Sequence, residues 1–377
     1  MNSPFNEKNL IKVRQICFIY IAFMPVNKFI FLPSRLASLA FEQLWVSLLL
    51  NFVIDGLILL ALLRVSEAKG NKTFYTYIRE RFGDVTAKII YFILAVFFLL
   101  KSIVPIFEHK AYVESTLYEM MPQSLIFFTF FIVSTYLCLK GLKVVGRCAD
   151  IAVWLTAAGL MIGLFLSVGY ADYSNLLPLI QKPAYNTVNA TFRSVLWHGD
   201  SLWFLLISGH FREEKLYKTK ITVSYAVGAL ATVFCIMTFY GVYGPISASQ
   251  NYAFSAVSVF SVIVTNIGRF DFISVFLVLF SEIFAISLPL VMATKCLERT
   301  FATKNSFIHA IIVNAIALTM TMLFSSDILK VLELYENYFF YVFAGVLLIS
   351  IIIFATAKRT QNPNSSAMEA EVENVKT

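Results

Sequence analysis

Residues Val13–Ala40, VRQICFIYIAFMPVNKFIFLPSRLASLA, form an apolar stretch that is long enough to cross a lipid bilayer. The stretch is interrupted in its middle. Pro25 has no backbone N–H and disfavours helical geometry at Met24, so the helical hydrogen-bond ladder is predicted to break there. Beyond Pro25, Asn27 and Lys28 place an amide and a primary amine near the expected bilayer midplane. An ionisable group at that depth costs about 2.5 kcal/mol or more and normally faces a cavity or a partner.

A second apolar run follows the interruption and ends at another proline, Pro33. Two half-helices with polar backbone between them form the substrate site of many secondary transporters. The sequence therefore predicts a binding site at the break, formed by Pro25, Val26, Asn27 and Lys28. The alternative is a proline-kinked structural helix whose Lys28 side chain extends to the membrane interface.

The composition is that of a helical integral membrane protein. Hydrophobic residues make up 59% of the 377 residues and charged residues only 14%, and the mean hydropathy is +0.75. A soluble domain carries nearer a quarter charged residues. The apolar runs are continuous rather than alternating, which indicates helices and not a barrel. We expect one transmembrane domain over residues 1–357 and a disordered cytoplasmic tail over residues 358–377.

The hydropathy pattern predicts about ten spans, at residues 13–40, 45–63, 89–107, 124–139, 149–168, 194–211, 221–243, 270–294, 307–324 and 338–357. The N-terminus, the loops after even-numbered spans and the C-terminal tail hold about 22 of the 30 Lys and Arg residues. This asymmetry predicts that both termini are cytoplasmic and that residues 172–189 form a loop on the opposite face. The net charge of +7 does not indicate a nucleic-acid partner, because the basic residues fall into alternate loops.

A second interruption lies in the sixth expected span, SVLWHGDSLWFLLISGHF (Ser194–Phe211). Glycine weakens a helix by about 1 kcal/mol and lets the backbone turn sharply. Spans one and six are corresponding positions in two five-span halves, so matching interruptions predict a binding site between inverted repeats. The predicted site residues here are His198, Gly199 and Asp200. The alternative places His198 and Asp200 in the outer leaflet, hydrated and structural.

The expected repeats cover residues 13–170 and 191–357. If the two interruptions face each other, Lys28 and Asp200 should pair, because a lone charge in a low-dielectric cavity is costly. Asp55 and Glu282 are the alternative partners of Lys28. Asp55 should face the bundle interior, whereas Lys101 and Glu282 either line the same cavity or form structural ties between helices.

No motif in the sequence indicates a cofactor, a metal site or an enzyme. The five cysteines and four histidines have no ligand spacing, and the cysteines do not form a disulfide framework. The segment KGNKT (Lys69–Thr73) lacks the upstream glycine of a phosphate loop. No Ser/His/Asp or Cys/His set has supporting context, so we expect no catalysis.

Several pieces of the chain carry a family resemblance when they are taken together. They are FLPSRLA (residues 31–37), EQLWVSLLL (42–50), KGLKVVGRCADI (140–151), NLLPL (175–179), the HGD break (198–200) and GRFDFISVF (268–276). In this order and spacing, over roughly Asn9–Phe354, the chain resembles the endospore germination permease family. These proteins are the B subunits of nutrient germinant receptors and relatives of amino acid–polyamine–organocation transporters.

The resemblance implies an all-α, LeuT-like fold with a 5+5 inverted repeat and discontinuous helices 1 and 6. It also implies a protein that binds a small nutrient, such as an amino acid, at the midplane breaks and triggers spore germination. The implied partners are a larger A subunit with membrane spans and a lipoprotein C subunit in the spore inner membrane. The alternatives are a free-standing amino acid transporter, proton-coupled through Asp200, Glu282 or Asp55, and an ion or water conduit.

The chain departs from the family pattern at both breaks. Family members commonly have a glycine-rich break in span one, where this chain has Pro25–Lys28. The usual Gly-Glu of span six is Gly199-Asp200 here. In the wider superfamily the exposed backbone at these breaks holds an amino acid's carboxylate and amine. Lys28 would instead hold a carboxylate directly or occupy the site as a tethered cation.

Overall fold

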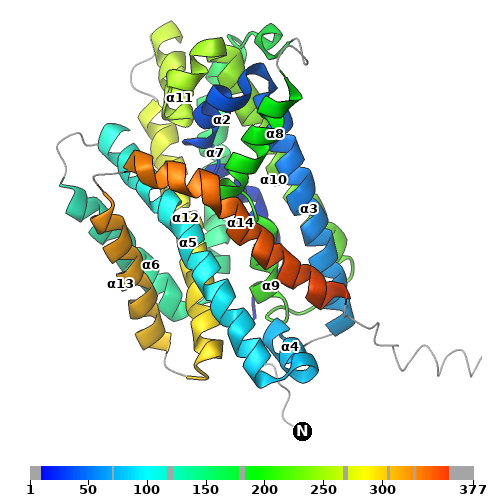
Figure 1. Ribbon diagram of the computed structural model, residues 1–377. Helices are drawn as coiled ribbons and strands as arrows, with labels where there is room; N and C mark the ends of the chain where they lie inside the picture. The colour runs from blue at the N-terminus through cyan, green and yellow to red at the C-terminus, as the bar shows by residue number, and fades with distance from the viewer. Residues whose placement is uncertain are drawn as a thin grey trace, which may run out of the picture.

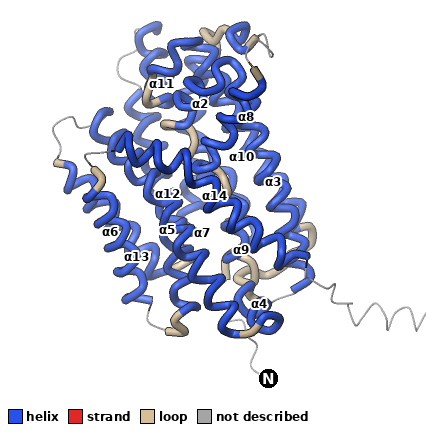
Figure 2. Tube along the Cα trace, viewed as in Figure 1, coloured by secondary structure: helices blue, strands red, loops and turns tan. Residues whose placement is uncertain are grey.

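The computed structural model describes residues 10–69, 72–116, 122–177, 183–265, 271–303, 306–325 and 328–355. Within these ranges the chain is helical apart from short connections, and it contains no strand (Figure 2). Seven spans in this part are long and apolar enough to cross a membrane. They overlap α3 (Leu44–Lys69), α5 (Asp84–Thr116), α7 (Leu142–Val168), α10 (Tyr217–Tyr243), α12 (Asp271–Thr300), α13 (Ser306–Leu323) and α14 (Ile328–Ala355). The protein is therefore an all-α, multi-pass membrane protein.

Shorter helices complete the described part of the chain. They are α1 (Val13–Val26), α2 (Leu32–Ala40), α4 (Phe74–Phe82), α6 (Gln123–Lys140), α8 (Ala184–Arg193), α9 (Trp203–Ile207) and α11 (Ala253–Thr265). In the centre of the bundle α12 packs against α5 and α7, and α1 packs against α7 and α10. Helices α6 and α13 pack together at one side, and α14 crosses the bundle obliquely (Figure 1). Helices α2, α8 and α11 lie at one end of the molecule and α4 lies at the other (Figure 1).

The first interruption begins two residues later than predicted. Helix α1 continues through Pro25, because the N–H of Asn27 still bonds the Phe23 carbonyl at 3.2 Å. Pro25 lacks only its own N–H donor, so helical hydrogen bonds to the residue four positions earlier continue as far as Asn27. The N–H of Lys28 then bonds the Pro25 carbonyl at 3.0 Å instead of the Met24 carbonyl. Pro25 and Val26 thus lie in the last turn of α1, and the break starts at Asn27.

Several helices occupy segments that the hydropathy pattern predicts as loops. Helix α8 begins at Ala184, whereas span six was expected to begin at Ser194, and α4 and α11 also lie in expected connections. The sequence of α8, AYNTVNATFR, is too polar for a hydropathy window, although it buries one face through Thr187, Ala190 and Thr191. Helix α5 likewise extends beyond the expected residues 89–107 at both ends. The expected tail, residues 358–377, lies outside the described residues.

Two close approaches join segments that are distant in sequence. The backbone N–H of Ile11, just before α1, donates to the His210 carbonyl at 2.9 Å, and Ile11 and Phe211 form an isolated parallel bridge. A Cβ atom at Gly228 would lie 2.5 Å from the Tyr20 carbonyl oxygen. Only glycine therefore allows α10 to approach the backbone of α1 so closely at this position. Together these contacts hold α1 against α10 and against the chain after α9.

Candidate functional site

The chain between α8 and α9 is broken at the HGD sequence. A 3-10 turn, η4 (Ser194–Trp197), is followed by extended backbone at His198, and a second turn, η5 (Asp200–Leu202), leads into α9. Between them Gly199 adopts φ +84°, in the left-handed region that side chains disfavour. A Cβ atom at Gly199 would also lie 2.6 Å from Phe343 Cε2. This position therefore requires glycine, and the turn it makes presents Asp200 to the bundle interior.

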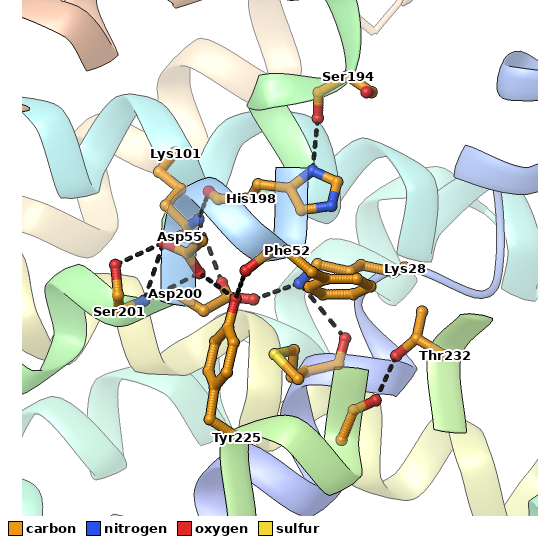
Figure 3. Close-up of polar contacts among 12 residues, drawn as sticks. Lys28, Phe52, Asp55, Lys101, Ser194, His198, Asp200, Ser201, Tyr225 and Thr232 are labelled. Carbon is orange, nitrogen blue, oxygen red and sulfur yellow. Dashed lines mark hydrogen bonds and ion pairs between the residues drawn. The ribbon is translucent and has the colours of Figure 1, made fainter. Parts of the chain in front are cut away.

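Lys28 and Asp200 form an ion pair that joins the two breaks directly (Figure 3). Neither side chain is more than 1% exposed. The Lys28 ammonium also donates to the Met24 carbonyl oxygen at 3.4 Å, the acceptor that the break leaves free. The ring centroid of Phe52 lies 5.8 Å from Lys28 Nζ. Lys28 is thus held by a carboxylate, a half-helix carbonyl and an aromatic face.

A second lysine and a second aspartate adjoin this pair. Lys101 Nζ of α5 lies 3.2 Å from Asp200 Oδ1 and also donates to the His198 carbonyl oxygen. Asp55 of α3 accepts hydrogen bonds from the Ser201 backbone N–H at 3.2 Å and from the Ser201 hydroxyl. Lys28, Lys101, Asp200 and Asp55, which we call the central cluster, are all buried. With two lysines and two aspartates, the central cluster has no net formal charge.

Glu282 does not belong to the central cluster. Its Oε2 lies 2.9 Å from His109 Nδ1, so it ties α12 to α5. The sequence left open whether Lys101 and Glu282 line the central cavity or tie helices together. Lys101 lies beside Asp200, whereas Glu282 forms a contact between two helices elsewhere. Asp55, the other alternative partner of Lys28, is held by Ser201 and by the Tyr225 hydroxyl at 3.1 Å.

His198 and Asp200 are buried, at 2% and 1% exposure, so the hydrated alternative does not describe them. Nδ1 of His198 lies 2.9 Å from the Ser194 carbonyl oxygen, which fits the tautomer protonated at Nδ1 and leaves Nε2 as an acceptor. That Nε2 atom is buried and has no hydrogen-bond partner among the described residues. The Oδ1 atom of Asn27, the residue before Lys28, is also buried without a hydrogen-bond partner among the described residues. Two acceptors near the ion pair are therefore unsatisfied.

A chain of aromatic side chains adjoins the central cluster through Tyr225, which bonds Asp55. Tyr20 stacks on Trp203 with ring centroids 6.1 Å apart and meets Tyr225 edge-on at 5.7 Å. The Tyr20 hydroxyl and Trp203 Nε1 are buried without a hydrogen-bond partner in the described part of the chain. Buried polar atoms are normally paired, so the unsatisfied atoms of Asn27, His198, Tyr20 and Trp203 call for an explanation. The central cluster and its neighbours thus combine hydrogen-bond donors, acceptors and both signs of charge in one buried region.

The sequence did not identify Ser201, Tyr20, Tyr225 or Trp203 as site residues. The only sequence feature that could have pointed to Ser201 is its position directly after Asp200. The tyrosines and Trp203 lie within apolar runs where nothing distinguishes them from core aromatics. Among the described residues, no group of three His, Cys, Asp or Glu side chains is arranged to hold a metal ion. All five cysteines are free.

A second ion cluster, the outer cluster, lies at the end of the molecule that holds α2 and α8. The Arg35 guanidinium of α2 donates from Nη2 to Glu336 Oε2 of α14 at 2.7 Å. Arg193, the last residue of α8, approaches the same oxygen at 3.9 Å. The Glu336 side chain is fully buried, whereas those of Arg35 and Arg193 are 36% and 34% exposed. The outer cluster therefore joins α2 and α8 to α14.

Comparison with solved structures identifies the fold. The chain is similar to a crystal structure of an Eremococcus coleocola manganese transporter in complex with an aromatic bis-isothiourea substituted compound, with a TM-score of 0.58 and 10% identity. A crystal structure of a mutant of that transporter gives a TM-score of 0.57 and 12% identity. Each alignment covers 94% of this chain and 80% of the other. At such identities the likeness shows a transporter fold and nothing of substrate.

Comparison at the level of sequence identifies the family. No curated protein matches the chain significantly. A family model described as spore germination protein matches residues 10–329, which is most of the chain and includes both breaks and the central cluster. This is a family of transporter-like membrane proteins and not of enzymes. The chain therefore belongs to the spore germination protein family.

Proposed function

We propose that this chain is the nutrient-binding B subunit of a spore germinant receptor. The ligand is a small nutrient of the amino-acid class, and it binds at the breaks of spans one and six. The observation that carries this proposal is the buried Lys28–Asp200 pair, which links the two breaks, at each of which a buried acceptor, Asn27 Oδ1 or His198 Nε2, has no hydrogen-bond partner among the described residues. Membership of the spore germination protein family supports the biological role.

A zwitterionic ligand suits a site closed by an internal ion pair. Its carboxylate replaces Asp200 as the partner of Lys28, and its ammonium replaces Lys28 as the partner of Asp200. Neither buried charge is then left alone, which keeps the exchange energetically feasible. His198 Nε2 and the Tyr20 hydroxyl supply further contacts. A preference of about 1–3 kcal/mol for the state with separated breaks shifts the equilibrium about 5- to 150-fold, and that shift is the signal.

The proposal includes a complete architecture. Ten spans form a 5+5 inverted repeat within one domain, residues 1–357, with α1–α2 as the first span and α8–α9 as the sixth. The transporter fold of the solved structures supports this arrangement. Both termini, with the tail over residues 358–377, face the cytoplasm from the spore inner membrane. The partners are an A subunit with membrane spans and a lipoprotein C subunit.

Substitution of Asp200 tests the proposal. Asp200→Asn keeps the side-chain shape but removes the charge that pairs with Lys28. Spores carrying the variant should lose most of their germination response to amino acids, and the purified variant should lose binding of the radiolabelled amino acid. Asp84→Asn is the control, because Asp84 is an exposed partner of Lys88 far from the breaks. A normal response by Asp200→Asn at equal protein level contradicts the proposal.

The transporter fold also favours the alternative function, a free-standing, proton-coupled amino acid transporter. Uptake of the labelled amino acid into proteoliposomes separates the two functions. The receptor binds the amino acid without net accumulation, whereas the transporter accumulates it when a proton gradient is applied. If genes for A and C subunits lie beside the gene for this chain, that arrangement favours the receptor; an isolated gene favours the transporter.

Cysteine labelling tests the proposed topology. Tyr185 on α8 and Lys72 before α4 are exposed and lie at opposite ends of the molecule (Figure 1). On a cysteine-free background, an impermeant thiol reagent added from outside should label Tyr185→Cys and spare Lys72→Cys. The reverse pattern contradicts the topology and, with it, the orientation of the inverted repeat.

A further inference from the structure

A third buried polar site lies outside both ion clusters, at Glu108. This residue follows Lys101 on α5 by seven positions, which places it about two helical turns closer to the outer cluster. Only 7% of the residue is exposed. Its Oε1 atom accepts a hydrogen bond from Trp197 Nε1 at 2.8 Å. Trp197 is the last residue of η4 and directly precedes the HGD break.

The charged groups that act electrostatically on Glu108 are themselves acidic. They are Glu282 on α12 and Glu336 on α14. Glu282 is in contact with His109, and Glu336 is paired with Arg35.

The basic neighbours of Glu108 on its own helix are also occupied. His109 contacts Glu282, and Lys110 pairs with Glu114. Among the described residues, no lysine or arginine forms an ion pair with Glu108. A lone carboxylate at this depth, with two further acids nearby, is strongly disfavoured in its ionised form.

We propose that Glu108 is a proton-binding site, neutral in this arrangement, and that Trp197 links its proton to the span-six break. The indole N–H stabilises a carboxylate more than a neutral carboxyl, because hydrogen bonds to charged acceptors are stronger. Loss of the proton therefore tightens the Trp197 contact, and uptake loosens it. By reciprocity, a movement of the break that withdraws Trp197 makes Glu108 hold its proton more firmly.

The infrared absorption of protonated carboxyl groups tests this directly on the purified full-length protein at neutral pH. Glu108→Gln removes the ionisable group but keeps an amide oxygen for Trp197, and it should abolish the signal of one protonated carboxyl. Glu80→Gln is the control, because Glu80 is an exposed partner of Lys72 on α4, and it should leave the signal intact. An unchanged spectrum for Glu108→Gln overturns the proton-binding site.

Trp197→Phe tests the link to the break. This variant removes the indole N–H, so the carboxyl band should keep its intensity and shift in frequency. An unshifted band overturns the link. If Glu108→Gln does not accumulate, Glu108→Asp keeps a carboxyl in an altered setting and should shift the same band. An unshifted band in Glu108→Asp overturns the assignment to Glu108. These readouts require no amino acid ligand, so they stand apart from the test of the proposed function.

Discussion

The central and outer clusters use similar ion pairs in different surroundings. In the central cluster, the side chains of Lys28, Lys101 and Asp200 are between 0% and 6% exposed. In the outer cluster, Glu336 is fully buried, but both of its arginines remain about a third exposed. A buried charge that loses its partner costs about 3–5 kcal/mol, whereas exposed pairs contribute about 0–1 kcal/mol.

This difference determines which charges water can stabilise when a pair opens. In the outer cluster water can solvate the arginines when they leave Glu336, but the fully buried Glu336 carboxylate then loses its partners. The central cluster can open only if something else satisfies its charges at the same moment. We infer that opening of the central cluster, in which every charge is buried, depends on a charged or zwitterionic molecule.

The largest expected effect comes from Asp200→Ala. This substitution leaves both Lys28 and Lys101 without the carboxylate they share, and it should lower the free energy of unfolding by about 3–5 kcal/mol. Lys28→Ala should be milder, because Lys101 still compensates Asp200 from 3.2 Å. The double variant should lose less than the sum of the two. Thermal unfolding of the purified proteins measures all three, and equal losses in the two single variants contradict the shared-carboxylate geometry.

A substitution at Gly199 tests the backbone of the central cluster instead of its charges. Gly199→Ala places a side chain at φ +84° and against the Phe343 ring, so it should lower stability by about 1–3 kcal/mol. Gly345→Ala on α14 is the matched control, because nothing lies within 4 Å of its added Cβ atom. The control should be neutral or slightly stabilising. A Gly199→Ala protein that unfolds at the same temperature as Gly345→Ala shows that the turn is not constrained.

The smallest effect is expected at the outer cluster. Glu336→Gln removes the charge but keeps the shape, and it leaves two arginines that are already partly hydrated. We expect a change of about 0–1 kcal/mol that shrinks as salt is added. Denaturant unfolding at low and high ionic strength measures it. A loss as large as that of Asp200→Ala, insensitive to salt, removes the distinction between the two clusters.

The sequence predicted the two breaks and the approach of Lys28 to Asp200 because the relevant signals are local. A proline, a glycine or a charge inside an apolar run is visible without knowledge of the fold. In transporters with two broken spans at corresponding positions, the two breaks face each other, which predicts that Lys28 and Asp200 lie close together. The position of the first break was early by two residues, since proline removes one donor and does not end a helix at once.

The remaining partners in the central cluster could not be predicted because they depend on tertiary packing. Ser201 and Asp55 are 146 positions apart, and Tyr225 and Asp55 are 170 apart. Nothing in an apolar run indicates which tyrosine reaches which carboxylate. Helix α8 was missed for a different reason, because its polar sequence resembles a loop until its buried face is known.

The bond between Ile11 and His210 joins the chain before α1 to the chain after α9 through peptide groups alone. Since both partners are backbone atoms, sequence drift at these two positions leaves the contact in place. Any motion that separates the start of α1 from the chain after α9 must break this bond, at a net cost of about 0.5–1.5 kcal/mol. The Ile11 amide proton is then free to exchange with solvent. Its deuterium uptake, followed with and without amino acid, therefore reports the separation of these two segments without any substitution in the chain.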